Sequence, residues 1–166
     1  MKRKILVLLL SIVGIVALSG FHAGSVDSSG TLFDKYGGYP TIKTVVDQSA
    51  AALLADPITA PFFVDIGKPG HDTVDRLLSC LDLQFSTVFG GPYTYPSISK
   101  FRAAPPGGYA CRDMKAAHVG LGITSAAFDR FVAIVAGILA KNGVTQQDIN
   151  TVAPVIIGLK DQVVGQ

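Results

Sequence analysis

The feature that most constrains this chain is an apolar stripe with helical spacing near its centre. Between residues 73 and 89, apolar side chains recur three or four positions apart, which places them on one face of an α-helix. Gly90, Gly91 and Pro92 follow directly and are residue types that end helices. A helix with one continuous apolar face must bury that face against other elements. The stripe consists of Val74, Leu77, Leu78, Leu81, Phe85, Val88 and Phe89.

Other segments show the same helical periodicity, and none alternates in the manner of a strand. Each of these segments is bounded by residue types that start or stop helices, such as threonine, asparagine, glycine and proline. We therefore expect an all-α fold. Besides the central helix, the expected helices cover residues 41–55, 112–118, 124 or 125 to 141, and 145 onwards.

Proline and glycine predict where these helices are interrupted. Pro154 lies inside the last helical pattern, and proline removes a backbone donor and clashes with the carbonyl four residues earlier. We therefore expect a kink or a break near Asn150. Residues 64–72 and 93–110 are rich in glycine and proline, which predicts two long loops.

The N-terminus has the pattern of an export signal. Lys2, Arg3 and Lys4 precede an apolar run over residues 5–18, which is shorter than the roughly 20 residues of a membrane-spanning helix. We expect residues 1–23 to form a signal peptide, or an uncleaved N-terminal anchor. Residues 24–31 then form a flexible leader, and residues 32–166 form one folded domain that does not span the membrane. The protein is accordingly expected to be exported, to the periplasm or the extracellular space.

Charge and histidine content restrict the chemistry. The net charge is only +2, and removing the signal leaves 11 basic against 12 acidic residues, which excludes nucleic acid as a partner. His118 is the only histidine placed on an expected helix. A helical domain rich in phenylalanine and aliphatic residues can enclose a flat apolar cofactor, with one imidazole as the axial ligand. Haem suits that description, although a lone histidine is more often an ordinary surface or packed residue.

Several motifs of the chain occur together in one known family. They include two glycine-containing turns, a Pro-Phe-Phe corner and a block around His118, and they follow one another in the order found in the group 1 truncated haemoglobins. The chain resembles that family from residue 32 almost to its C-terminus. The motifs are Leu32-Phe33-Asp34-Lys35-Tyr36-Gly37-Gly38, Val45-Val46-Asp47, Leu54-Ala55-Asp56-Pro57, Pro61-Phe62-Phe63, Phe89-Gly90-Gly91-Pro92, and Met114-Lys115-Ala116-Ala117-His118 continuing to Ile123.

This resemblance implies a two-over-two helical sandwich around haem b. His118 corresponds to the proximal iron ligand, and Phe63 to the aromatic residue that packs flat on the haem. Arg112 or Lys115 is expected to pair with a haem propionate, unless both are solvated surface residues. The complete set of expected haem contacts is His118, Phe63, Leu77, Leu81, Phe85, Met114, Lys115, Ile123 and Phe128.

The chain departs from the family pattern on the distal side of the expected haem. The family usually places a Phe-Tyr pair, whose hydroxyl hydrogen-bonds the ligand, where this chain has Ser49 and Ala50. The positions that often hold glutamine correspond to Leu77 and Leu81. The usual donors are therefore missing, and Gln48, Ser49 or Gln84 reaches the ligand only if its helix is rotated relative to this alignment. We expect weak, rapidly reversible oxygen binding, or a preference for NO or CO.

The two cysteines leave three possibilities open. Cys80 and Cys111 form a disulfide, as is common in exported proteins, or both remain buried free thiols. Alternatively, Cys80 binds the iron, because it lies where some relatives carry a distal histidine. His71 is expected to be exposed in a loop.

Three classes of function follow from this sequence. The first is a haem protein that reversibly binds a diatomic gas, such as oxygen, NO or CO. The second is a haem enzyme, either an NO dioxygenase with an unidentified electron donor or a peroxidase-like catalyst. The third is a helical interaction module that retains the fold without haem.

Overall fold

The computed structural model describes residues 30–166, so the expected signal peptide and most of the leader lie outside the described residues. Within that range the regular secondary structure is mostly helical, as the sequence predicts. No helix between residues 30 and 166 combines the length and hydrophobicity needed to cross a bilayer. The elements are α1 (Leu32–Lys35), α2 (Tyr39–Ala55), the 3-10 helix η1 (Ala60–Phe63), α3 (Val74–Val88), β1 (Ile98–Ser99), β2 (Tyr109–Ala110), α4 (Met114–His118), α5 (Ser125–Lys141), α6 (Gln146–Ile157) and α7 (Lys160–Val163).

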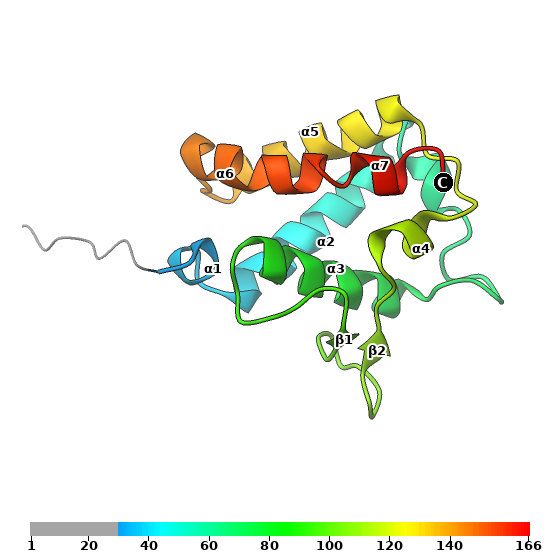
Figure 1. Cartoon of the computed structure of the whole chain (residues 1–166), viewed down its shortest axis with the longest axis horizontal. Helices are drawn as coiled ribbons and strands as arrows, with labels where there is room; N and C mark the ends of the chain where they lie inside the picture. Colours follow the sequence, from blue (N-terminus) through cyan, green and yellow to red (C-terminus); the bar gives the residue numbers. More distant parts are fainter. Residues whose placement is uncertain (1–29) are drawn as a thin grey trace, which may run out of the picture.

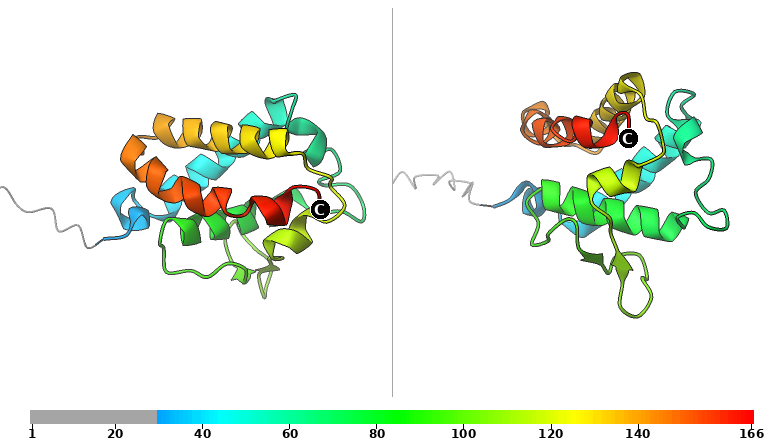
Figure 2. Two further views of the ribbon diagram at one scale, coloured as in Figure 1. Left: turned by 45° about the horizontal axis from the view of Figure 1, so that its top comes forward. Right: turned by 45° about the vertical axis from the view of Figure 1, so that its right-hand side comes forward.

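Two helix pairs form the body of the molecule. Helices α2 and α3 pack against each other, α5 packs against α6, and α2 also contacts α5 across the layers (Figure 1). The turned views in Figure 2 show the α5–α6 layer lying across the α2–α3 layer, which is the expected two-over-two sandwich. The core between the layers is built around Ile42, Val45 and Val46 of α2, each at most 2% exposed.

Side-chain caps fix where the helices begin. Thr73 accepts a hydrogen bond from the backbone N–H of Arg76, so α3 starts at Val74, and Thr124 caps α5 in the same way. The choice between Thr124 and Ser125 is thereby settled, since Ser125 is the first residue of the helix. The same capping by Asp113 sets the start of the short helix α4.

The expected long loop contains one short element of β structure. Residues 93–110 contain a short antiparallel ladder in which Ile98 pairs with Ala110 and Ser99 with Tyr109. Strands of two residues are too short to show the alternation by which a strand is recognised in sequence. This β1–β2 hairpin packs against α3 on the side away from α5 and α6 (Figures 1 and 2).

Of the kink or break expected near Asn150, the break is wrong, and the kink stays a prediction. Helix α6 continues through Pro154 to Ile157, and the chain turns at Gly158 before α7. Proline removes the donor of a single hydrogen bond, which the buried contacts of Ile149, Val152 and Ile156 outweigh. The interruption therefore falls one turn beyond the proline.

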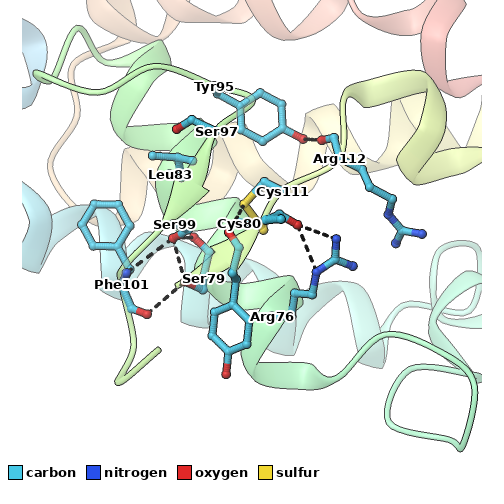
Figure 3. Close-up of a disulfide and its surroundings, with 12 residues drawn as sticks. Arg76, Ser79, Cys80, Leu83, Tyr95, Ser97, Ser99, Phe101, Cys111 and Arg112 are labelled. Carbon is cyan, nitrogen blue, oxygen red and sulfur yellow. Dashed lines mark hydrogen bonds between the residues drawn. A yellow bond between two sulfur atoms is a disulfide. The ribbon is translucent and has the colours of Figure 1, made fainter. Parts of the chain in front are cut away.

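The hairpin is attached to α3 by buried polar groups. The side chains of Ser79 and Asp82 on α3 are fully buried. Asp82 accepts hydrogen bonds from the guanidinium of Arg102, at 2.5 and 2.9 Å, and one from the Tyr39 hydroxyl at 3.1 Å. Ser79 donates to the carbonyl oxygen of Phe101 at 2.9 Å (Figure 3). One side of α3 is therefore held by directional bonds.

Candidate functional site

The opposite side of α3 faces an apolar cavity of about 400 Å³. Its walls come from α2, η1, α3, α4, α5, α6 and α7, so it lies between the two layers of the sandwich. Its volume is within the range of small-molecule and cofactor sites. Only three of its lining residues carry polar side chains: Thr59, Gln84 and His118.

The structure gathers nearly all of the expected site residues at this cavity. Lys115 alone is exposed and does not line it. The residues whose contribution the sequence did not reveal include Ile66 in the loop after η1, and Leu159 and Val163 at the C-terminal end. Local sequence carries no signal for these three, because only the tertiary fold brings them to the cavity. The expected residues that line it are His118, Phe63, Leu77, Leu81, Phe85, Met114, Ile123 and Phe128.

The short helix α4 both carries and orients His118. Its Nδ1 lies 2.6 Å from the carbonyl oxygen of Met114, one helical turn earlier. That contact places the proton on Nδ1 and leaves Nε2 with a free lone pair. Burial lowers the pKa of His118, the hydrogen bond to Met114 acts in the opposite direction, and the charge of Arg112 lowers it further. The net effect lowers the pKa of His118 from its ordinary value, which favours the neutral form of the imidazole that binds a metal.

The wall contributed by α2 and α3 is almost without hydrogen-bonding groups. Ala50, Leu77 and Leu81 line the cavity at the positions where the sequence predicts missing donors. Gln48 is instead paired with the side chain of Asn142, and the buried Ser49 lies outside the cavity lining. These two residues therefore do not reach the cavity.

The two cysteines form a disulfide, which rules out both the free thiols and the Cys80 iron ligand. The sulfur atoms are 2.04 Å apart (Figure 3). Cys80 belongs to the side of α3 that faces the hairpin, whereas a ligand would have to project from the side that carries Leu77 and Leu81. The bond joins α3 to Cys111, three residues before Met114 begins α4.

Charged residues near the cavity form a separate cluster. Asp72 accepts hydrogen bonds from both Arg76 and Arg112, and Arg76 also donates to the carbonyl of Ala110 at 2.6 and 3.2 Å. Arg112, one of the two expected propionate partners, is thus paired with a carboxylate of the protein. His71 is exposed, as expected, and lies outside the cavity lining.

The fold and the site together define a small helical protein whose apolar cavity contains one neutral histidine. Residues 31–164 match the family of bacterial-like globins, and the chain belongs to that family. It is 26% identical over 138 residues to the group 1 truncated haemoglobin GlbN of Nostoc sp. (strain MUN 8820), covering 82% of this chain and 98% of that protein. The resemblance seen in the sequence motifs is thereby confirmed.

Solved structures share the same architecture. The Fe(III) form of the truncated haemoglobin from Tetrahymena pyriformis has a TM-score of 0.65 and 24% identity, covering 82% of this chain and 100% of that one. The 2/2 haemoglobin from Synechococcus sp. PCC 7002, solved in the cyanomet state with covalently attached haem, has a TM-score of 0.63 and 20% identity, with coverage of 82% and 100%. At these identities the likeness establishes the two-over-two globin fold.

Membership of a globin family implies a haem cofactor, and the residues present fit one. The donor set is a single neutral imidazole of fixed tautomer, on an otherwise apolar wall with phenylalanines from η1, α3 and α5. Between residues 30 and 166, no cluster of three or more histidine, cysteine or acidic side chains is arranged to bind a bare metal ion. The site therefore suits a flat apolar macrocycle better than a metal ion alone.

Proposed function

We propose that this protein binds haem b, that Nε2 of His118 would hold the haem iron, and that the iron would supply a reversible binding site for a diatomic gas. One observation carries the proposal: among residues 30–166, His118 is the only titratable side chain lining a cavity that is otherwise almost entirely apolar. Bound haem supplies an iron centre with one coordination position for the gas.

The chain's own residues prepare the site in two ways. The carbonyl of Met114 holds the Nδ1 proton of His118, which fixes the ring orientation and makes Nε2 the available donor. Phe63, Leu77 and Leu81 line the cavity with apolar surface that excludes water. Water exclusion and a neutral imidazole both favour stable retention of the cofactor.

The scarcity of donors determines which gases the site favours. A hydrogen bond to a partly charged ligand is worth roughly 1.5–3 kcal/mol, and the usual donor positions are occupied by Ala50, Leu77 and Leu81. We propose that oxygen binds more weakly and escapes faster than it would with donors at these three positions, which gives a relative preference for NO and CO. A slowly dissociating oxygen complex in stopped-flow measurements would contradict this part of the proposal.

The test is the absorption spectrum of the purified protein in its ferric and ferrous states. The wild type and His71→Ala should show a Soret band, whereas His118→Ala should lose the band or show an altered, weakly held haem. His71 is a matched control because it is a histidine outside the cavity. Absence of the Soret band from the wild type would refute haem binding and favour a haem-free interaction module.

The apolar wall also bears on catalysis. Peroxidase-like turnover benefits from an acid–base group beside the substrate, and the α2 and α3 residues lining the cavity include none that titrates. NO dioxygenation makes no such demand, but it needs an external electron donor. We therefore propose gas binding as the main activity and NO dioxygenation as the second candidate, to be tested by NO consumption with a chemical reductant.

We further propose that the protein is exported. The basic and apolar segments at the N-terminus support this, and the Cys80–Cys111 disulfide adds support because such bonds persist in oxidising compartments. Cell fractionation with N-terminal sequencing tests the proposal. We expect cleavage after residue 19, 20 or 23. An uncleaved protein in the cytoplasm would contradict the proposal.

A further inference from the structure

We infer that Gln84 sets the ligand preference of the cavity, by donating a hydrogen bond to a polar gas ligand from a position on α3 that the usual donors do not occupy. The inference rests on the proposed haem function. It makes a separate claim about one side chain of this chain.

The other polar side chains of the cavity already use their protons in hydrogen bonds. The Thr59 hydroxyl donates to the carbonyl oxygen of Leu53 at 2.7 Å, and Thr59 is only 4% exposed. The Nδ1 proton of His118 is held by Met114, which leaves only an acceptor nitrogen on that ring. Neither side chain has a proton to offer to a ligand in the cavity.

The side-chain amide of Gln84, by contrast, is free to donate. Its side chain lines the cavity and is half-buried, and among residues 30–166 its amide has no hydrogen-bond partner. Gln48, the nearest chemical equivalent on the same layer, is bonded to Asn142 through both its oxygen and its nitrogen. Of the side chains lining the cavity, Gln84 therefore has the only free donor.

The position of Gln84 on α3 indicates the direction of its side chain. Gln84 follows Leu81 by three residues and Leu77 by seven, so all three lie on one face of α3. Side chains on a helix lean toward its N-terminus, which carries the long glutamine side chain back over the turn of Leu81. We therefore expect the amide to extend along the wall that the leucines leave apolar.

An amide N–H at this position discriminates between gases by their charge. Oxygen becomes partly negative when it binds to haem, whereas CO stays nearly apolar, so a donor strengthens oxygen binding more. Replacing Gln84 by leucine should weaken oxygen affinity by about tenfold or more, the equivalent of one charge-assisted hydrogen bond. The affinity for CO should change by less than about twofold, because CO gains little from the same donor.

The experiment compares Gln84→Leu with Gln48→Leu in the haem-loaded full chain. Oxygen and CO affinities are measured together with the infrared stretching frequency of bound CO, which reports the local field without turnover. The expected result is a lower ratio of oxygen to CO affinity and a shifted CO frequency in Gln84→Leu only. Gln48→Leu makes the same chemical change outside the cavity and should leave both unchanged. Gln84→Met is a second variant of similar length, should the leucine disturb folding.

The outcomes separate this inference from the proposed function. A normal Soret band with unchanged oxygen-to-CO ratio and CO frequency in both Gln84 variants would overturn the inference alone. Equal losses of oxygen and CO affinity would also overturn it, because they would mark a general disturbance of the cavity. A wild type without a Soret band would overturn the proposed function itself, and the inference with it.

Discussion

The two sides of α3 differ in burial and in the kind of contact they make. Toward the hairpin, Ser79 and Asp82 are fully buried and are bonded to groups that the hairpin segment supplies. Toward the cavity, Leu77 and Leu81 meet open volume and make only apolar contacts. The hairpin side of the helix is therefore held by hydrogen bonds and an ion pair, whereas the cavity side presents apolar side chains.

This difference assigns separate tasks to the two sides. Hydrogen bonds and ion pairs have preferred geometries, so the hairpin side fixes the position and rotation of α3. Apolar contacts are non-directional and accept any complementary apolar surface. We conclude that the hairpin side sets the structure, which leaves the cavity side free to accommodate a cofactor.

The largest effect is expected from breaking the buried ion pair on the hairpin side. Arg102→Met removes the guanidinium that compensates Asp82 and leaves an unpaired charge in a fully buried position. The free energy of unfolding should fall by about 3–5 kcal/mol. Urea denaturation of the apo protein measures it, with the exposed Lys100→Met as the control. A loss below about 1 kcal/mol would show that directional bonds do not hold this side.

The next effect is expected from the covalent link on the same side. The double variant Cys80→Ser, Cys111→Ser opens a loop with a sequence separation of 31 residues. The chain-entropy model predicts a loss of about 3–4 kcal/mol. Thermal unfolding of the wild type with and without a dithiol reductant should reproduce the shift. The reductant should leave the double variant unchanged, and a shift there would mean that it acts elsewhere.

A smaller stability effect with a larger ligand effect is expected on the cavity side. Leu77→Gln introduces an amide at a half-buried position, which should cost roughly 1–2 kcal/mol in the apo protein. In the haem-loaded protein it should slow oxygen release by about tenfold. Stopped-flow dissociation and urea denaturation give the two numbers. If Leu77→Gln instead destabilised the protein as much as Arg102→Met, the two sides would not differ as proposed.

The smallest effect on stability is expected from lowering the pH. Burial acts to raise the pKa of Asp47, but hydrogen bonds from Lys43 and Arg102 outweigh it, so the net pKa lies below 3.8. An aspartate with a lowered pKa stabilises the fold above its ordinary pKa and loses that contribution as the pH falls through the lowered value. Stability of the wild type should thus decline below about pH 4, and Asp47→Asn should decline less steeply. Parallel declines would assign the acid sensitivity to other carboxylates.

Sequence periodicity located most of the helices, because each buried stripe is a local pattern. The expected helix over residues 73–89 is observed as Val74–Val88, and Thr73 caps it. The histidine was also identified correctly as a cavity residue, because the block around it is specific. The parts that failed are non-local: Arg102 and Asp82 pair across 20 residues, and nothing near either residue indicates the other.

The same limit applies to the cavity. Alignment of motifs predicted the absence of donors at Ala50, Leu77 and Leu81, and the cavity lining agrees with it. The alignment did not decide which of Gln48, Ser49 and Gln84 reaches the ligand, because that depends on the rotation of α2 and α3. That rotation is set by the packed layers and by the hairpin, neither of which can be read from one helix at a time.

The attachment of α3 on its hairpin side has a consequence for motion. A helix held by a disulfide at Cys80 and by a buried ion pair at Asp82 belongs to the last part of the fold to open. Movement of a ligand past α3 would then depend on rotations of side chains that line the cavity, such as Phe85, rather than on displacement of the helix. The bonds on the hairpin side of α3 thereby restrict which motions can admit a ligand on its cavity side.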